Sequence, residues 1–184
     1  METKNQNLYL IKPNVMNCGF SSIMLQDIEK EFNIDKLELI KFDQKESKLF
    51  YKSASLAHVE KYGKEVAENI SSRVSKFMSS DKMLFMLVSP KKPEHLKLSQ
   101  EDFIDITRKY AEKLREEYKQ DHLEYKQAAN SIHSSDNIHS FKEDLTNIQL
   151  VLKKLSITNK LNVFNSKNIE KSIIDAISDV LKNE

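Results

Sequence analysis

The chain has 184 residues, of which 39% are hydrophobic and 31% are charged, and its formal net charge is +1. This length and composition predict one domain with a buried core, and the near-neutral charge argues against a broad basic surface for nucleic acid. The single cysteine, Cys18, excludes an intramolecular disulfide and argues against a cysteine-based zinc site. No apolar run has membrane-spanning length and the first residues lack a signal-peptide core, so we expect a cytoplasmic protein without a membrane partner.

Strands and helices are predicted to alternate along the chain. In order we expect a strand at 7–12, a helix at 20–32, a strand at 36–42, helices over 46–78 in two pieces that join near Gly63, a strand at 83–88, a helix over about 99–127, a short strand at 130–132, a helix at 140–152 and a last helix at 166–183. Apolar residues spaced three and four apart identify the helices, and short apolar runs identify the strands. This order favours an α+β fold of ferredoxin-like type, with a four-stranded antiparallel sheet covered by helices.

Two short segments carry a family resemblance. Residues 130–137, Asn-Ser-Ile-His-Ser-Ser-Asp-Asn, resemble the active-site signature of nucleoside diphosphate kinases, in which an asparagine and two small or apolar residues precede His-Gly-Ser-Asp. Near the N-terminus, Leu8-Tyr-Leu-Ile-Lys-Pro13 resembles the strand that ends in that family's phosphate-binding Lys-Pro. The resemblance covers about residues 7–149. We therefore expect a nucleoside diphosphate kinase-like domain at 1–149, followed by a helical C-terminal extension at 150–184.

The resemblance implies that His133 is a nucleophile that carries a phosphoryl group. An imidazole suits this task, because a large part of it is neutral at pH 7 and a nearby carboxylate can fix its ring. In the family a glutamate eleven residues after the histidine has this role, and here that position is Asp144, whose side chain is one methylene shorter. Ser135 is expected beside the phosphate.

Four further residues correspond to nucleotide or phosphate contacts of the family. Lys12 is expected to contact the terminal phosphate and the sugar hydroxyl, and Asn130 to bind the sugar. Arg115 resembles an arginine found in divergent members of the family, and its planar guanidinium is suited to binding a phosphate. The alternative, which the sequence leaves open, is an exposed arginine paired with Glu112 or Glu116 of its own helix. Tyr62, fifteen residues before Phe77, corresponds to a tyrosine that lines the phosphate site, or is an ordinary amphipathic tyrosine.

The sequence also departs from the family. Ile70 stands where a phenylalanine stacks on the base, and Ser134 replaces the glycine after the histidine. The glycine-rich segment after the third strand, with its second phosphate arginine, is replaced by a charged helix. The loss of cationic contacts predicts reduced catalytic power, because each such contact is worth several kcal/mol in the transition state.

The functional prediction therefore has two main alternatives. One is a divergent nucleoside diphosphate kinase that takes the terminal phosphate of ATP on His133, passes it to a nucleoside diphosphate and uses Mg²⁺ carried by the nucleotide. The other is a weak or inactive family member that acts as a structural or interaction module, for example in a ciliary axoneme, through a homo-oligomer or a protein partner docked on residues 166–183. A nucleotide sensor that binds without transfer is a third alternative.

Overall fold

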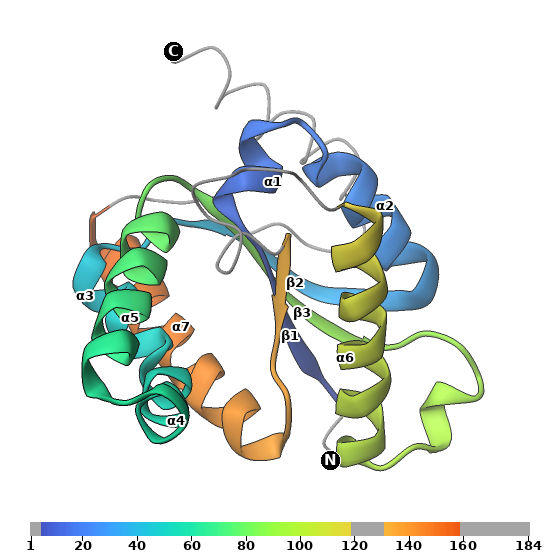
Figure 1. The fold of residues 1–184 in the computed structure, drawn as a ribbon. Helices are drawn as coiled ribbons and strands as arrows, with labels where there is room; N and C mark the ends of the chain where they lie inside the picture. Colours follow the sequence, from blue (N-terminus) through green and yellow to red (C-terminus); the bar gives the residue numbers. More distant parts are fainter. Residues whose placement is uncertain (1–4, 119–130, 159–184) are drawn as a thin grey trace.

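A computed structural model describes residues 5–118 and 131–158 of the chain (Figure 1). The sheet has four antiparallel strands in the order β2-β3-β1-β4. Its strands are β1 at Asn7–Ile11, β2 at Phe32–Ile40, β3 at Met83–Pro90 and β4 at Ile132–Ser134. This arrangement confirms the predicted ferredoxin-like α+β class. Among the described residues, strand β4 lies at the edge of the sheet and pairs with β1 alone.

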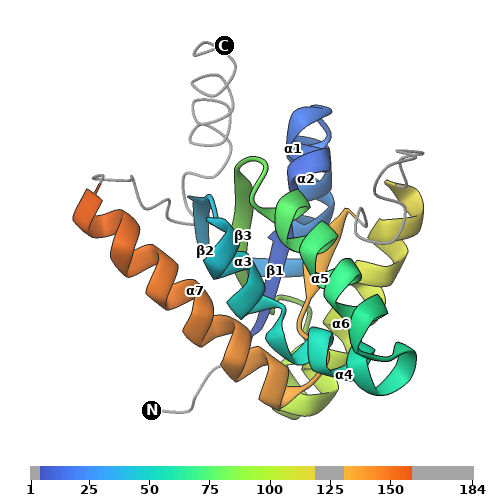
Figure 2. The same cartoon turned by 60° about the vertical axis from the view of Figure 1, so that its left-hand side comes forward.

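Helices cover both faces of the sheet (Figure 2). They are α1 at Pro13–Asn17, α2 at Ser21–Glu31, α3 at Gln44–Phe50, α4 at Lys52–Tyr62, α5 at Lys64–Met78, a 3₁₀ turn at His95–Lys97, α6 at Gln100–Glu117 and α7 at Ile138–Thr158. One buried cluster joins the sheet to α2 and α6, and another joins the opposite face to α3, α5 and α7. Among the described helices none combines the length and the apolar character that crossing a bilayer requires.

The element boundaries differ from the sequence predictions in instructive places. Strand β2 begins at Phe32, before the predicted start at residue 36. The sequence did not indicate this start, because a register shift between Ile34 and Lys36 breaks the alternation of side chains along the strand. The segment predicted as two helices over 46–78 contains three, since the chain breaks at Tyr51 as well as at Gly63, where φ is 79°. The short helix α1 was not predicted.

The C-terminal part of the described chain is one continuous helix. Helix α7 passes through residue 149, where the sequence analysis placed the end of the domain, and Ile148 and Val151 belong to the same buried cluster. The packing of the domain therefore continues beyond that predicted boundary. The predicted last helix at 166–183 lies outside the described residues.

The register between β1 and β4 determines which face of the sheet carries the histidine. His133 lies opposite Leu10, and Leu10 packs in the cluster formed with α3, α5 and α7. Side chains alternate along a strand, so Ser134, opposite Tyr9, faces α6 instead. Lys12 follows Leu10 by two residues in extended backbone, with φ −85° and ψ 164°, which directs its side chain to the same face as that of His133.

Candidate active site

His133 forms a direct contact with the carboxylate predicted to hold it. Its Nε2 lies 2.8 Å from Oδ2 of Asp144, on the first turns of α7. Ser135, which is fully buried, donates its hydroxyl to the same oxygen at 2.7 Å. Asp144 therefore reaches the imidazole without a bridging water, although its side chain is shorter than a glutamate. The sequence analysis placed the Ser135 hydroxyl beside a phosphate, whereas in the structure it anchors the carboxylate.

These contacts assign the protons on the imidazole. An ionised carboxylate only accepts hydrogen bonds, so the neutral ring donates from Nε2 and keeps its lone pair on Nδ1. No group in residues 5–118 or 131–158 has a hydrogen bond with Nδ1. The side chain of His133 is 18% exposed. The site thus contains an oriented, partly accessible nitrogen nucleophile.

Two aromatic residues at the end of α3 form a wall beside the imidazole. The ring centroids of Phe50 and Tyr51 lie 5.1 Å and 5.8 Å from that of His133, and both contacts are edge-on. Helix α3 starts with a capping box, in which Asp43 accepts the backbone N–H of Glu46 and the Glu46 carboxylate accepts that of Asp43. Burial, followed by the Asp144 charge, raises the pKa of Tyr51 above its ordinary value, so its hydroxyl stays neutral.

Lys12 also lies near the Tyr51 ring. Its Nζ is 5.8 Å from the centroid of that ring, and only 5% of the residue is exposed. Burial, and then the positive charge of Arg115, lowers the pKa of Lys12 to about 7. Lys12 and His133 therefore both approach the same aromatic ring from neighbouring strands. The ammonium group gains its full charge near neutral pH only when an anion compensates for its burial.

Arg115 connects helix α6 to the strand that carries the histidine. Its Nε donates to the backbone carbonyl of Ile132 at 2.9 Å, and its charge acts on Lys12. Of the two glutamates in the alternative interpretation, Glu112 and Glu116, the first binds Arg108 at 2.6 Å. Arg115 therefore secures the outer edge of β4 and adds a second positive charge to the site.

One predicted site residue has its contacts elsewhere. Tyr62 is 47% exposed at the end of α4, and its ring contacts are with His58 and Lys61. Tyr51, and not Tyr62, is the tyrosine that contacts both Lys12 and His133 among the described residues. Asn130 lies outside the described residues.

Tyr51 is the residue that the sequence analysis missed. It stands directly after an apolar helix residue, Phe50, and looks like a core position. A detectable signal was the capping box of Asp43 and Glu46, which starts a short helix and puts its C-terminal end at Tyr51. A helix of that length after β2 would have pointed to Tyr51 rather than to Tyr62.

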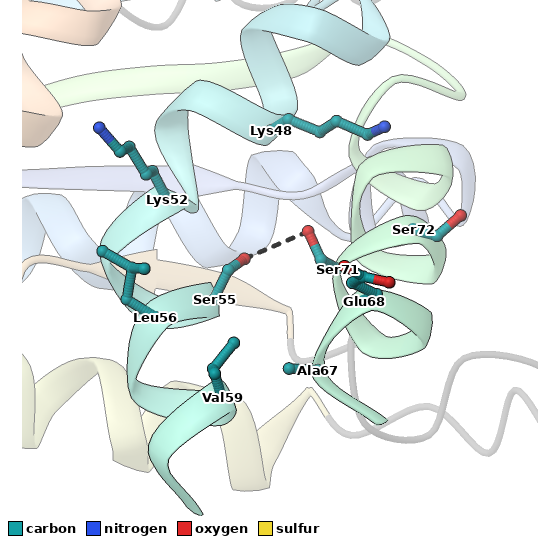
Figure 3. Close-up of a pocket in the computed structure, with 9 residues that line it drawn as sticks. All are labelled: Lys48, Lys52, Ser55, Leu56, Val59, Ala67, Glu68, Ser71 and Ser72. Carbon is teal, nitrogen blue, oxygen red and sulfur yellow. Dashed lines mark hydrogen bonds between the residues drawn. The ribbon is translucent and has the colours of Figure 1, made fainter. Parts of the chain in front are cut away.

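A separate pocket of about 520 Å³ opens between α4 and α5 (Figure 3). Its walls are apolar at Leu56 and Val59, and a 3.2 Å hydrogen bond joins Ser55 to Ser71 across it. None of its lining residues belongs to the group around His133. In the part of the chain that the structure describes, no cluster of three histidine, cysteine or acidic side chains could hold a metal ion.

Comparisons with known proteins agree on the architecture. No protein-family model and no curated protein match the sequence. Among solved structures, the nucleoside diphosphate kinase of Aquifex aeolicus has a TM-score of 0.58 and 19% identity, covering 79% of this chain and 95% of its own. The NDP kinase of Pyrobaculum aerophilum has a TM-score of 0.57 and 16% identity, with the same coverages of 79% and 95%. The nucleoside diphosphate kinase of Borrelia burgdorferi, a transition-state mimic with vanadate and ADP, has a TM-score of 0.60 and 15% identity, covering 77% of this chain and 84% of its own.

The chain has the fold of the nucleoside diphosphate kinases. The sequence resemblance to that family and the fold therefore agree. At identities of 15–19% the likeness establishes the fold alone.

Proposed function

We propose that the protein transfers terminal phosphates between nucleoside triphosphates and diphosphates through a phosphohistidine at His133. The observation that carries the proposal is the 2.8 Å contact between His133 Nε2 and Asp144 Oδ2, which leaves Nδ1 as the basic nitrogen of the ring. Lys12, whose Nζ lies 5.8 Å from the centroid of the same Tyr51 ring that contacts His133, adds a cation to the site. A nucleophile next to a cation is the minimum that phosphoryl transfer needs.

The proposed reaction has two balanced steps. In the first, the Nδ1 lone pair of His133 attacks the γ-phosphorus of ATP, an N–P bond forms, and the bond to the β–γ bridging oxygen breaks with its electrons leaving on ADP. In the second, a terminal oxygen of a nucleoside diphosphate attacks the phosphorus and the N–P electrons return to Nδ1. Asp144 supports both steps, because its charge compensates for the positive charge on the phosphorylated ring.

Lys12 and Arg115 supply the positive charge that the transferring phosphoryl group requires. Lys12, with a pKa of about 7, takes up a proton when an anion binds beside it. The guanidinium of Arg115 uses Nε for the strand and has further N–H donors on its fork. A Mg²⁺ ion would arrive with the nucleotide, bound by its phosphates, as part of the substrate.

The test is covalent labelling with γ-³²P-ATP and Mg²⁺. Wild-type protein should acquire an acid-labile, alkali-stable label, as expected for phosphohistidine, and should lose it on addition of a nucleoside diphosphate. His133→Asn should take up no label. His139→Gln removes an exposed histidine from the first turn of α7 and is the matched control. Unlabelled wild-type protein would refute the proposal.

A second candidate function is an interaction module with little turnover. One observation favours it: helices α4 and α5 expose large apolar side chains, with Leu56 58%, Tyr62 47% and Val66 50% accessible. The sequence analysis expected a protein partner docked on residues 166–183 or a second copy of the chain, and these partners and an axonemal location stay predictions. Failure of labelling together with concentration-dependent association, lost in Leu56→Ser, would favour this candidate over the kinase.

A further inference from the structure

Asn7, the first residue of β1, is fully buried and has no part in the chemistry proposed above. Its Nδ2 lies 2.7 Å from Oγ1 of Thr107, 3.1 Å from Oγ of Ser134 and 3.3 Å from the backbone oxygen of Ser135. Its Oδ1 accepts the backbone N–H of Leu8 at 2.8 Å. The side chain thus contacts helix α6 and strand β4 simultaneously.

The partners fix the orientation of this amide. The hydroxyl of Thr107 donates to backbone carbonyls of its own helix, with Phe103 O at 3.0 Å and Ile104 O at 2.8 Å, so its oxygen remains an acceptor for Asn7. The three atoms around Nδ2 are all oxygens, whereas Oδ1 faces an N–H group. Reversing the amide would place oxygen against oxygen, so a single orientation is compatible with these contacts.

The amide holds the part of β4 that has the fewest other restraints. Strand β4 contains three residues and pairs with β1 on one side only. Ser134 lies between His133 and Ser135, and both of these neighbours contact Oδ2 of Asp144. A rotation of the strand about its own axis would move both neighbours away from that oxygen. The Asn7 amide opposes such a rotation from the opposite face of the sheet.

We propose that Asn7 is a positioning residue: its amide holds Ser134 and the Ser135 carbonyl so that His133 and Ser135 reach the same oxygen of Asp144. The kinetic consequence of this role rests on the proposed phosphohistidine function, but the structural consequence does not. The side chain of Ser134, in the place of a glycine in the resembling signature, gives the amide an acceptor that a glycine would lack.

The test compares Asn7→Leu with Asn33→Leu. Leucine has the same number and branching of heavy atoms as asparagine and offers no hydrogen-bond donor, so the first variant removes the amide while keeping the site filled. Asn33 is the matched control, because its Nδ2 donates to the backbone oxygen of Pro90 at 2.6 Å on β2, the other edge strand. Each full-length variant is selectively labelled with ¹⁵N-histidine, and the His133 tautomer is measured by NMR on unphosphorylated protein.

The expected results separate positioning from general destabilisation. Asn7→Leu should convert the Nε2–H tautomer of His133 into a mixture and should slow single-turnover phosphorylation by ATP about 10- to 100-fold, as loss of an orienting contact typically does. Asn33→Leu should lower resistance to urea without changing the tautomer or the rate. A wild-type tautomer in folded Asn7→Leu overturns the proposal.

A second variant covers the case in which Asn7→Leu does not fold. Ser134→Ala leaves the amide of Asn7 in place and removes one of its acceptors, so it should produce a smaller shift of the tautomer in the same direction. An unchanged tautomer in Ser134→Ala then overturns the proposal. Wild-type protein that takes up no phosphate would refute the kinase function, while the tautomer comparison would still decide the role of Asn7.

Discussion

Replacement of Lys12 by methionine should stabilise the fold while removing a cation from the site. Lys12 is 5% exposed, and burial, then Arg115, lowers its pKa from 10.5 to about 7. At 1.36 kcal/mol for each pKa unit, this difference corresponds to roughly 5 kcal/mol as an upper bound on the cost of burying the charge. Methionine is unbranched and of similar length. Because replacing buried charges by apolar groups is often favourable by about 1–4 kcal/mol, we expect a gain of that order near pH 7.

The pH dependence of the stability difference between Lys12→Met and wild type is a sharper test than the size of that difference at pH 7. The folded pKa of Lys12 lies below the unfolded one, so the unfolded chain binds more protons between about pH 7 and pH 10.5. This residue therefore makes the wild-type fold more stable as pH rises through that window, with a slope of at most about 1.4 kcal/mol per pH unit. Lys12→Met lacks this contribution, and its advantage over wild type should shrink with rising pH.

Urea denaturation at pH 7 and pH 9.5 measures the effect. Lys48→Met, which removes an exposed lysine of α3, controls for the change in net charge. A stability difference between Lys12→Met and wild type that is the same at both pH values, or a destabilised Lys12→Met at pH 7, would refute the argument.

Three further predictions concern the site and its supports. Asp144→Asn should slow phosphohistidine formation about 100-fold, since an amide can donate to Nε2 and misorient the ring; initial labelling rates comparable to wild type would contradict this. Binding of ADP with Mg²⁺ at pH 8 should take up protons, because a bound anion restores the charge of Lys12; calorimetric enthalpies that do not vary between buffers of different ionisation enthalpy would argue against it. Asp43→Ala should lower the free energy of unfolding by about 1 kcal/mol, because the N–H groups of Lys45 and Glu46 lose the carboxylate that accepts them; unchanged urea midpoints would show that the cap is unimportant.

The parts of the fold with one consistent hydrophobic period were predictable from the sequence. Strands β1 and β3 are short apolar runs, and both were located within a few residues. Helix α6 has an apolar face at helical spacing, which located its start, but it ends at Glu117 and not near residue 127 as predicted. The start of β2 was missed because the register shift near Asp35 puts two successive side chains out of step with the pleat. The break at Tyr51 was missed because it contains neither glycine nor proline, the usual signals of a helix boundary.

The residues of the candidate site that belong to a sequence motif were predictable, whereas those defined by contacts across the sheet were not. The segment around His133 pointed to the histidine and to Asp144, and the Lys-Pro pair pointed to Lys12. Tyr51 and Asn7 carry no such signature, because their importance comes from the register of β1 with β4 and from the length of α3. Only three-dimensional placement separates Asn7 from an ordinary core position, whereas the capping box that starts α3 was an indirect signal for Tyr51.

The burial of Lys12 also bears on how this chain has been selected. If Lys12→Met is more stable than wild type, as predicted above, a chain that does not bind phosphate groups gains nothing from this lysine, and methionine or leucine should replace it in such descendants. The residue at position 12 in related sequences would then indicate whether the proposed phosphoryl transfer is retained.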